Sequence, residues 1–292
     1  MIQQKYSNFL LYSVLILPWV ITFGIFWMYP LFQALFISFT KYDTLQSSSV
    51  WIGFDNYVRA FSDHLFWKSL RTTTLFTVVT VPLSTSLALF LALLVHSEKL
   101  RFANFFRATY FLPSVTSLVV IALIFTNIYS RDGYVVSLLR FFSFISGDSG
   151  ILQSPTTALW GIIAMDVWIS AGYYMVLFLA GLQSIPKDLY ESASLFGASS
   201  WQKLVKITIP LLKPTLVFII VINTIKTFQV FVEIYVMTKG GPLYSTTTLV
   251  YMVYQKAFNE LNQMGYASAI AFILFVIISL LTYVQLKLVK KL

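Results

Sequence analysis

The sequence predicts an all-α membrane protein whose helices cross a bilayer six times. Of its 292 residues, 58% are hydrophobic and only 11% are charged, and the mean hydropathy is positive. A soluble globule could not remove so much apolar surface from water. Six apolar runs each reach the ~20 residues that a hydrocarbon core requires. They cover residues 10–39, 69–95, 108–129, 156–182, 211–237 and 263–286.

The first run begins close to the N-terminus, but we expect a retained span and not a signal peptide. It is too long for a signal-peptide core, only Lys5 precedes it as a basic residue, and it lacks a small-residue cleavage site. Residues 40–68 mix charged residues with tryptophans, which is too polar for a span and typical of a loop with an interfacial helix. We therefore expect residues 1–292 to form a single transmembrane domain.

Residues 186–210 form the longest polar run between two predicted spans, and they predict two short helices joined by a bend. Pro186 suits a first helical position, and acidic residues follow in the opening turns, where a helix favours negative charge. Gly197 then interrupts the helix. Ser199, with Gln202 three residues later, has the form of a capping box that begins a second helix.

In this segment the sequence resembles the permease subunits of binding-protein-dependent ABC importers, in the branch with maltose-type and glycerol-phosphate-type permeases. The family's loop reads Glu-Ala-Ala, three residues, Gly, nine residues, Ile-x-Leu-Pro, and only Ser192 and Ile209 depart from it, conservatively. The resemblance implies a type I ABC importer permease with cytoplasmic coupling helices, which sit in a cleft of the ATP-hydrolysing subunit. The implied ATPase-coupling residues are Glu191, Ser192, Ala193, Gly197, Ile207 and Pro210.

The resemblance covers most of the chain. Residues 238–242 are similar to a Thr-x-Gly-Gly-Pro loop of the family, and residues 265–269 resemble the entry to its last span. Alone, the glycines and the proline of the first motif indicate only a turn that any membrane hairpin needs. Likewise, residues 186–210 alone are compatible with an amphipathic helix on the membrane surface. The spacing of the motif favours coupling helices.

Two predicted spans carry polar residues at helical spacing. In the fourth span they stand at i, i+4 and i+7, and in the fifth at i, i+3 and i+4, continued by Val230 and Glu233, so each set is expected on one face. Because polar groups facing hydrocarbon are costly, each face should line a partner helix or a water-filled cavity. The main members are Asp166, Ser170 and Tyr173, and Asn223, Lys226 and Thr227.

These six residues have two interpretations, a translocation path and interhelical hydrogen bonding that holds the bundle together. The resemblance favours the path, because the matching positions line the sugar pocket of maltose-type permeases. Trp168 and Tyr174 are assigned to packing. For Lys226 two hypotheses remain: a structural ion pair with Asp166 or Glu233, or contact with a negative group of the substrate, which would then be an acidic sugar.

The distribution of lysine and arginine predicts the orientation. With the N-terminus inside, the inner segments hold eleven lysines and arginines against three acidic residues, and the outer segments hold eight against six. Short loops rich in basic residues stay in the cytoplasm, so we expect both termini and residues 186–210 on the cytoplasmic side of a bacterial inner membrane. The basic residues are scattered without a stripe, which argues against nucleic-acid binding.

The resemblance implies the membrane-spanning subunit of an ATP-driven importer for a sugar or oligosaccharide, which works by alternating access coupled to separate ATPase subunits. The implied partners are a second homologous permease, two ATPase subunits that bind ATP and Mg²⁺, an extracytoplasmic solute-binding protein and membrane lipid. The chain has no cysteine, two histidines and no Gly-Lys dipeptide for a P-loop, so we expect no metal, no cofactor and no enzymatic activity of its own. An ion-coupled secondary transporter is the alternative, but its usual internal repeat is not evident.

Overall fold

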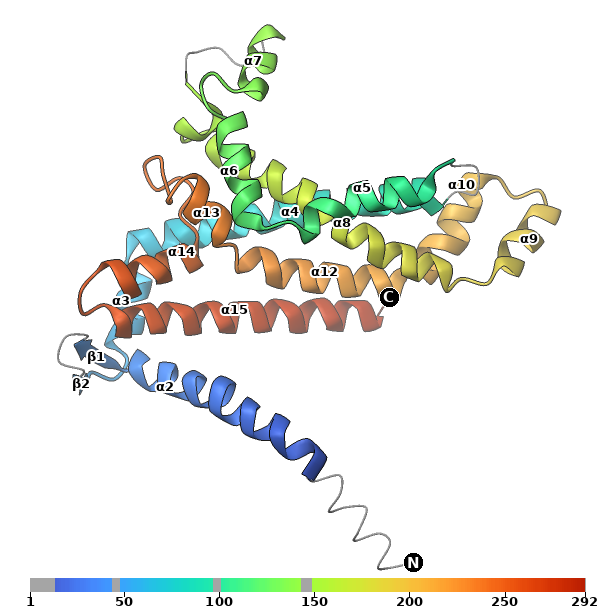
Figure 1. The fold of residues 1–292 in the computed structure, drawn as a ribbon. Helices are drawn as coiled ribbons and strands as arrows, with labels where there is room; N and C mark the ends of the chain where they lie inside the picture. The colour runs from blue at the N-terminus through green and yellow to red at the C-terminus, as the bar shows by residue number, and fades with distance from the viewer. Residues whose placement is uncertain (1–13, 44–47, 97–100, 143–148, 292) are drawn as a thin grey trace, which may run out of the picture. The chain divides into compact units, whose positions relative to one another are not determined.

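The structure, a computed structural model, describes residues 14–43, 48–96, 101–142 and 149–291 (Figure 1). Residues 10–13 of the first apolar run lie outside the described residues, as do Lys5, Glu98, Lys99 and Asp148 of the charge count. Contacts group the chain into two compact units. The first comprises Met1–Asp63 with Val253–Leu274, and the second comprises His64–Met252 with Phe275–Leu292.

The first unit contains the first span and a β-hairpin. A helix runs from Val14 to Ser38 and includes a π-helical turn. The hairpin departs from the all-α expectation for residues 40–68, and its strands are rich in the β-branched and aromatic residues that favour strands. The elements of the first unit are η1 (Gly24–Met28), α2 (Tyr29–Ser38), β1 (Thr40–Asp43), β2 (Ser48–Trp51), α3 (Asp55–Ser62), η4 (Gln255–Asn259) and the start of α15 (Met264–Lys291).

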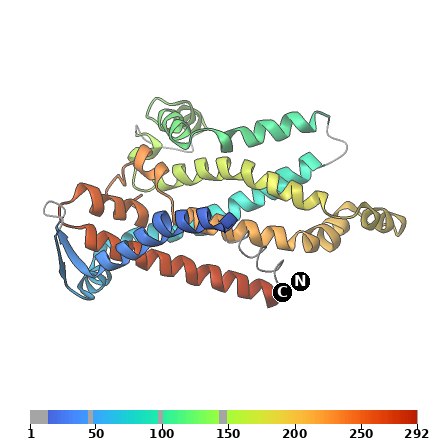
Figure 2. The ribbon, with the colours of Figure 1, turned by 60° about the horizontal axis from the view of Figure 1, so that its bottom comes forward.

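The second unit is built around α8, against which α4, α5 and α12 pack. Figures 1 and 2 show these helices running alongside one another, with α9 and α10 beyond one end of α8 and α13 beyond the other. The elements of the second unit are α4 (His64–His96), α5 (Ala103–Val115), α6 (Leu118–Ile128), α7 (Tyr134–Phe141), η2 (Ile151–Gln153), α8 (Ala158–Gln183), α9 (Lys187–Leu195), α10 (Ser200–Lys203), η3 (Leu204–Thr208), α11 (Ile209–Leu211), α12 (Lys213–Phe228), α13 (Val232–Met237) and α14 (Leu249–Tyr254). The last of these continues into the first unit.

Small and hydroxyl-bearing residues let α4 approach its neighbours closely. Its buried stripe repeats every three to four residues. Without a hydrophobic driving force between helices in lipid, such small residues favour close packing and interhelical hydrogen bonds. The stripe includes Ser69, Thr73, Thr77, Thr80, Ser84, Ala88 and Ala92.

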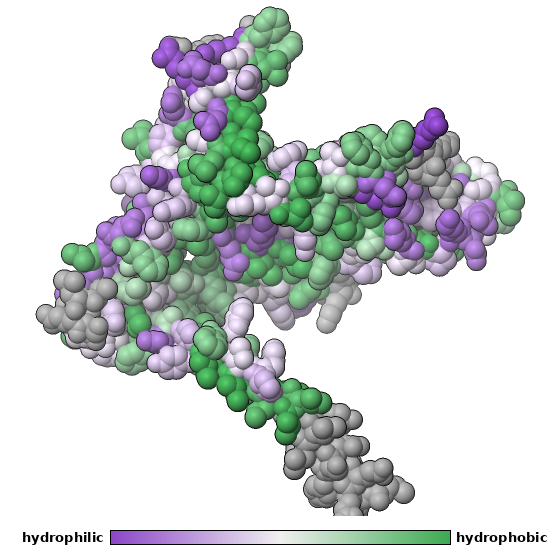
Figure 3. Space-filling view, viewed as in Figure 1, coloured by the Kyte–Doolittle hydropathy of each residue, from purple (hydrophilic) through white to green (hydrophobic). Residues whose placement is uncertain are grey.

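The span prediction agrees with the structure when one bent pair counts as a span. Five helices of the described residues are long and apolar enough to cross a membrane, and α5 with α6 makes a sixth as a bent pair. Hydrophobic side chains cover the exposed surface of α6 and of the helix that ends at Ser38 (Figure 3). The chain is therefore a multi-pass membrane protein with an outward hydrophobic surface.

The third span is not the continuous helix that the apolar run 108–129 predicted. α5 and α6 meet at 95°. Pro113 lacks the N–H that would continue the ladder, and the Ser114 and Thr116 hydroxyls donate to the carbonyls of Phe111 and Leu112 at 2.7 and 2.9 Å. These hydrogen bonds satisfy backbone groups that the bend exposes.

The fifth span is also broken, which corrects the predicted single face from Asn223 to Glu233. α12 ends at Phe228, and α13 begins at Val232. The Thr248 hydroxyl donates to the carbonyl of Val230 at 3.0 Å, so a distant loop satisfies the backbone at the break. Val230 and Glu233 therefore do not continue the α12 face.

We expect Gly172→Ala to destabilise the protein by about 1–3 kcal/mol, a typical cost of overpacking. A Cβ at Gly172 on α8 would overlap the main-chain carbonyl oxygen of Tyr110 on α5, so the two helices would have to separate. The measurement is thermal unfolding of the purified protein in detergent. Gly24→Ala is the matched control, because a Cβ there meets no atom within 4 Å. Equal midpoints for the two variants would contradict the close approach of α5 and α8.

Candidate functional site

A charged cluster joins α12 to α8 inside the second unit. The Lys226 ammonium lies 3.1 Å from Asp166 Oδ1 and donates to Ser170 Oγ at 2.8 Å. Ser170 in turn donates to Asp166 Oδ2 at 3.3 Å. Of the two acidic partners considered from the sequence, Asp166 is thus the one in ion-pair contact with Lys226. A charge at this depth requires such a partner, because an unpaired ammonium would be costly in a span.

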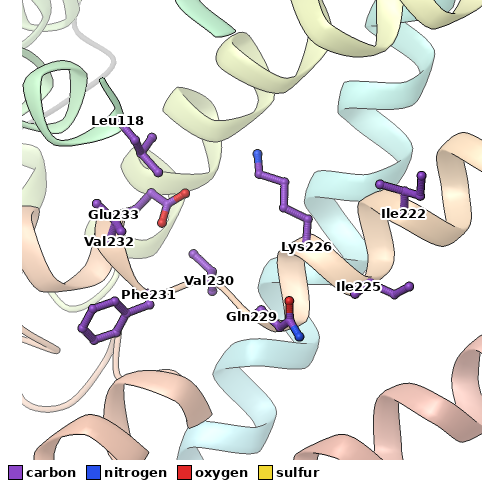
Figure 4. Close-up of a pocket in the computed structure, with 9 residues that line it drawn as sticks. All are labelled: Leu118, Ile222, Ile225, Lys226, Gln229, Val230, Phe231, Val232 and Glu233. Carbon is purple, nitrogen blue, oxygen red and sulfur yellow. The ribbon is translucent and has the colours of Figure 1, made fainter. Parts of the chain in front are cut away.

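The two charged groups differ in exposure. The Lys226 side chain is 42% exposed, whereas the Asp166 side chain is 2% exposed. Lys226 borders two cavities, of about 420 and about 320 Å³. In Figure 4, Lys226 rises from α12 and the Glu233 side chain enters from α13 on the other side of the larger cavity. The pair therefore presents its cationic member to open space and keeps its carboxylate covered.

The smaller cavity brings together three of the six residues predicted to bind substrate. Ser170, Tyr173 and Lys226 line it, and Asp166 lies directly behind Ser170 and Lys226. Tyr173 is 45% exposed, and its ring meets that of Tyr174 at 5.3 Å in a T-shaped arrangement. A hydroxyl, an ammonium and aromatic rings thus converge, which is the mixture of apolar walls and few polar groups typical of small-molecule sites.

The other two predicted residues are buried and do not line the cavity. Asn223 is fully buried and donates from Nδ2 to Ser84 Oγ on α4 at 2.8 Å. The Thr227 hydroxyl is buried and donates within α12, to the Asn223 carbonyl at 2.8 Å. Because Lys226 projects toward α8 while Asn223 projects toward α4, the predicted residues do not share one face. The bond of Asn223 matches the interhelical interpretation of the polar stripe.

Sequence reasoning did not select several residues that line the cavities. Ser114 and Tyr174 line the smaller cavity, Gln229 lines the larger one, and Ile222 lines both. The signal for Ser114 was its place after Pro113 within an apolar run, which marks the bend between α5 and α6. Gln229 follows the last residue of α12, so only the position of the helix break brings it to the cavity.

The segment 186–210 folds as two short helices, as predicted. α9 begins at Lys187 after Pro186, which is the N-cap and not the first helical residue. Gly197 adopts φ +75°, a left-handed conformation that glycine accepts at no steric cost. The capping box of α10 is confirmed: Ser199 Oγ accepts from the Gln202 N–H at 3.3 Å, and the Ser199 N–H donates to Gln202 Oε1 at 2.8 Å.

The bend between α9 and α10 exposes large apolar side chains. Leu195, Phe196 and Trp201 are 89%, 92% and 70% exposed. Two hydrogen bonds stabilise the bend from inside, between the Tyr190 and Thr208 hydroxyls at 2.9 Å and from Lys203 Nζ to Ser194 Oγ at 2.6 Å. A contiguous exposed apolar surface marks an interaction site. The predicted coupling residues Glu191, Ser192, Ala193, Gly197, Ile207 and Pro210 all lie in this segment, and all are exposed or half-buried.

Comparison with known proteins identifies similar chains over most of the sequence. Residues 84–292 match the family described as binding-protein-dependent transport system inner membrane component. The probable ABC transporter permease protein YesP of Bacillus subtilis (strain 168) is 39% identical over 276 residues, with 92% of this chain and 87% of YesP covered. The lactose transport system permease protein LacF of Rhizobium radiobacter is 35% identical over 271 residues, with 92% and 90% covered.

A solved structure also has a similar fold. It is the crystal structure of a bacterial ABC transporter involved in the import of the acidic polysaccharide alginate. The similarity has a TM-score of 0.84 and covers 99% of this chain and 98% of that chain, at 23% sequence identity. At this identity the comparison shows the shared fold.

We expect Lys226→Met to destabilise the protein by about 1–3 kcal/mol, because it leaves the Asp166 carboxylate covered without its cation. Adding Asp166→Asn removes the unpaired charge and should recover most of the loss. Thermal unfolding in detergent measures both effects. As a control, Lys256→Met breaks the pair with Glu260, whose carboxylate side chain is 44% exposed and stays hydrated, and should cost less than about 1 kcal/mol. A double variant less stable than Lys226→Met would contradict the structural ion pair.

Proposed function

The chain belongs to the family of binding-protein-dependent transport system inner membrane components, and from this premise we propose that it is the membrane-spanning subunit of an ATP-driven sugar importer. The substrate class is a sugar or oligosaccharide, as the lactose transport relative suggests. The observation that carries the proposal is the cavity in which Lys226, Ser170 and Tyr173 converge between membrane-spanning helices. The comparisons give no support to the alternative of an ion-coupled secondary transporter.

In this proposal Ser170 and Tyr173 contact the solute directly and Asp166 orients Lys226. Ser170 offers a hydroxyl, and the half-exposed ring of Tyr173 offers a flat surface for a sugar. Asn223 contributes from behind the cavity wall, because its hydrogen bond to Ser84 fixes α12 against α4, and Thr227 bonds the main chain of α12. The α12 side of the cavity is thereby supported by α4.

We also propose that Lys226 contacts a negative group of the solute, so that the preferred cargo is an acidic sugar such as a uronate oligosaccharide. A lysine that served only to neutralise Asp166 could be covered as completely as its partner. Instead its side chain is 42% exposed and borders both cavities. An ammonium exposed at such a cavity attracts a carboxylate of the solute by its charge.

The segment 186–210 is proposed to couple transport to ATP hydrolysis by partner subunits. Its exposed Leu195, Phe196 and Trp201 form an apolar surface of the kind that packs into a cleft of another protein. The full assembly would contain a second homologous permease, two ATPase subunits that bind ATP and Mg²⁺, and an extracytoplasmic solute-binding protein. The chain would form one permease domain, with both termini and this segment on the cytoplasmic side of the inner membrane.

We expect Glu191→Lys to reduce ATPase binding and transport by about tenfold or more, equivalent to about 1.4 kcal/mol of docking free energy. Glu191 is exposed on α9, beside the apolar surface, so the substitution reverses a charge at the proposed contact without removing packing. Co-purification of the ATPase subunits and solute uptake measure the effect.

The matched control is Asp132→Lys, which makes the same charge change at an exposed position before α7. This variant should bind the ATPase normally. Assembly with reduced stimulation of hydrolysis in Glu191→Lys would still agree with coupling. Normal assembly together with normal transport would contradict a coupling role for this segment.

The role of Lys226 in substrate contact is tested in the double variant Lys226→Met/Asp166→Asn, which lacks the ion pair but leaves no unpaired charge. We expect uptake of uronate oligosaccharides to fall at least about tenfold, equivalent to about 1.4 kcal/mol, while the complex still assembles. Uptake is compared for matched neutral and uronate oligosaccharides in proteoliposomes that contain the whole transporter. Unchanged uronate uptake by an assembled double variant would limit Lys226 to a structural role.

A further inference from the structure

The helix α3, outside the predicted spans, has three distinct faces. Asn56 and Ala60 are buried. A second face carries the exposed charged residues Asp55 and Arg59, four residues apart. A third face is apolar although it is exposed: Phe54, at the N-cap, is 69% exposed, Val58 is 62% exposed and Phe61 is 55% exposed. Trp51, the last residue of hairpin strand β2, is 61% exposed. We call Trp51, Phe54, Val58 and Phe61 the α3 apolar face.

The buried side of α3 is attached to the end of the first span. Asn56 Nδ2 donates to the carbonyls of Ser38 and Thr40 at 2.9 and 3.0 Å. These carbonyls lie where the helix Val14–Ser38 ends and the hairpin begins. The start of α15 meets the same point, since a Cβ at Gly265 would overlap the Thr40 carbonyl oxygen. Two membrane-spanning helices thus have their ends at α3, which fixes it near the edge of the hydrocarbon.

Aromatic contacts connect the α3 apolar face to the surface of the first span. Phe36, exposed on that span, has its ring centroid 5.9 Å from Trp51. Phe39 stacks on Trp51 at 5.5 Å and meets Phe54 edge to face at 5.2 Å. Phe36 belongs to the exposed hydrophobic surface of an apolar span, so the α3 apolar face continues that hydrophobic surface. Figure 2 shows the hairpin at the end of this helix.

The polar side of α3 is oriented by the start of α15. The Arg59 guanidinium lies 4.1 Å from the centre of the Tyr266 ring and donates to Gln263 Oε1 at 2.7 Å. The Tyr266 hydroxyl donates to Asp63 Oδ2 at 2.7 Å. These contacts set the rotation of α3 about its axis, so the apolar face has one fixed direction.

We propose that the α3 apolar face lies in the headgroup region of the bilayer and anchors the end of the first span at a fixed depth. An amphipathic helix with aromatic residues on its apolar face typically lies about 5–10 Å into this boundary. Tryptophan and tyrosine are enriched there because their rings are apolar with a polar edge. The occupant of the face is therefore membrane lipid, in continuity with the lipid around the span.

Because the chain has no cysteine, labelling at a single introduced cysteine marks one position of this chain. Phe61→Cys and Asp55→Cys place a nitroxide label on the apolar and polar faces of α3 in the whole transporter, reconstituted in nanodiscs. Power-saturation spectroscopy then compares the access of oxygen, which concentrates in lipid, with that of a water-soluble nickel chelate. We expect oxygen access to exceed nickel access at residue 61 and the order to be reversed at residue 55.

Two outcomes would overturn the proposal. Nickel access at residue 61 equal to that at residue 55 would mean that water covers the face. An immobile label with low access to both reagents at residue 61 would mean that a partner protein covers it. If Phe61→Cys fails to assemble, Val58→Cys reports on the same apolar face, and the same readings decide.

Discussion

The contact between the Lys226 ammonium and Asp166 is the constraint on which the second unit depends. It places opposite charges on α12 and α8 at a depth where neither charge is tolerated alone. Two polar side chains add hydrogen bonds near this contact. Ser170 is hydrogen-bonded to both charged groups, and Asn223 joins α12 to α4 through Ser84. The three helices are thereby held together, and both cavities open beside Lys226, the larger toward α6 and α13 and the smaller toward α8 and Ser114 of α5.

Breaks in the spans are tolerated because side-chain hydroxyls donate hydrogen bonds to backbone carbonyls near them. At the bend between α5 and α6, Ser114 and Thr116 bond the carbonyls that precede them. At the break after α12, the hydroxyl of Thr248 bonds the carbonyl of Val230. Irregular backbone at membrane depth persists only where protein or a cavity surrounds it. Both breaks border the cavities, so irregular backbone here contributes polar groups to the site.

The connectivity of the chain relates the proposed solute site to the proposed coupling segment. Residues 186–210 join α8 directly to α12, and these are the two helices that carry Asp166 and Lys226. Tyr190 bonded to Thr208 ties the two arms of the segment together, so it can move as a unit. Any displacement of the segment by a partner would act on both helices at once, and thus on the distance between the charged groups.

The sequence by itself determined the membrane class, the number of apolar runs and the two helices of residues 186–210, because hydropathy, helix caps and motif spacing are local properties. The capping box at Ser199 and the bend at Gly197 needed no distant contact. Only the tertiary structure decided which residues of the polar stripes meet. Helical spacing put Asn223, Lys226 and Thr227 on one broad side of α12, but the positions of α4 and α8 divide that side between them. The break before α13 also escaped prediction, because it depends on a partner outside the span, Thr248 for Val230. The hairpin escaped prediction because each of its strands is only four residues long.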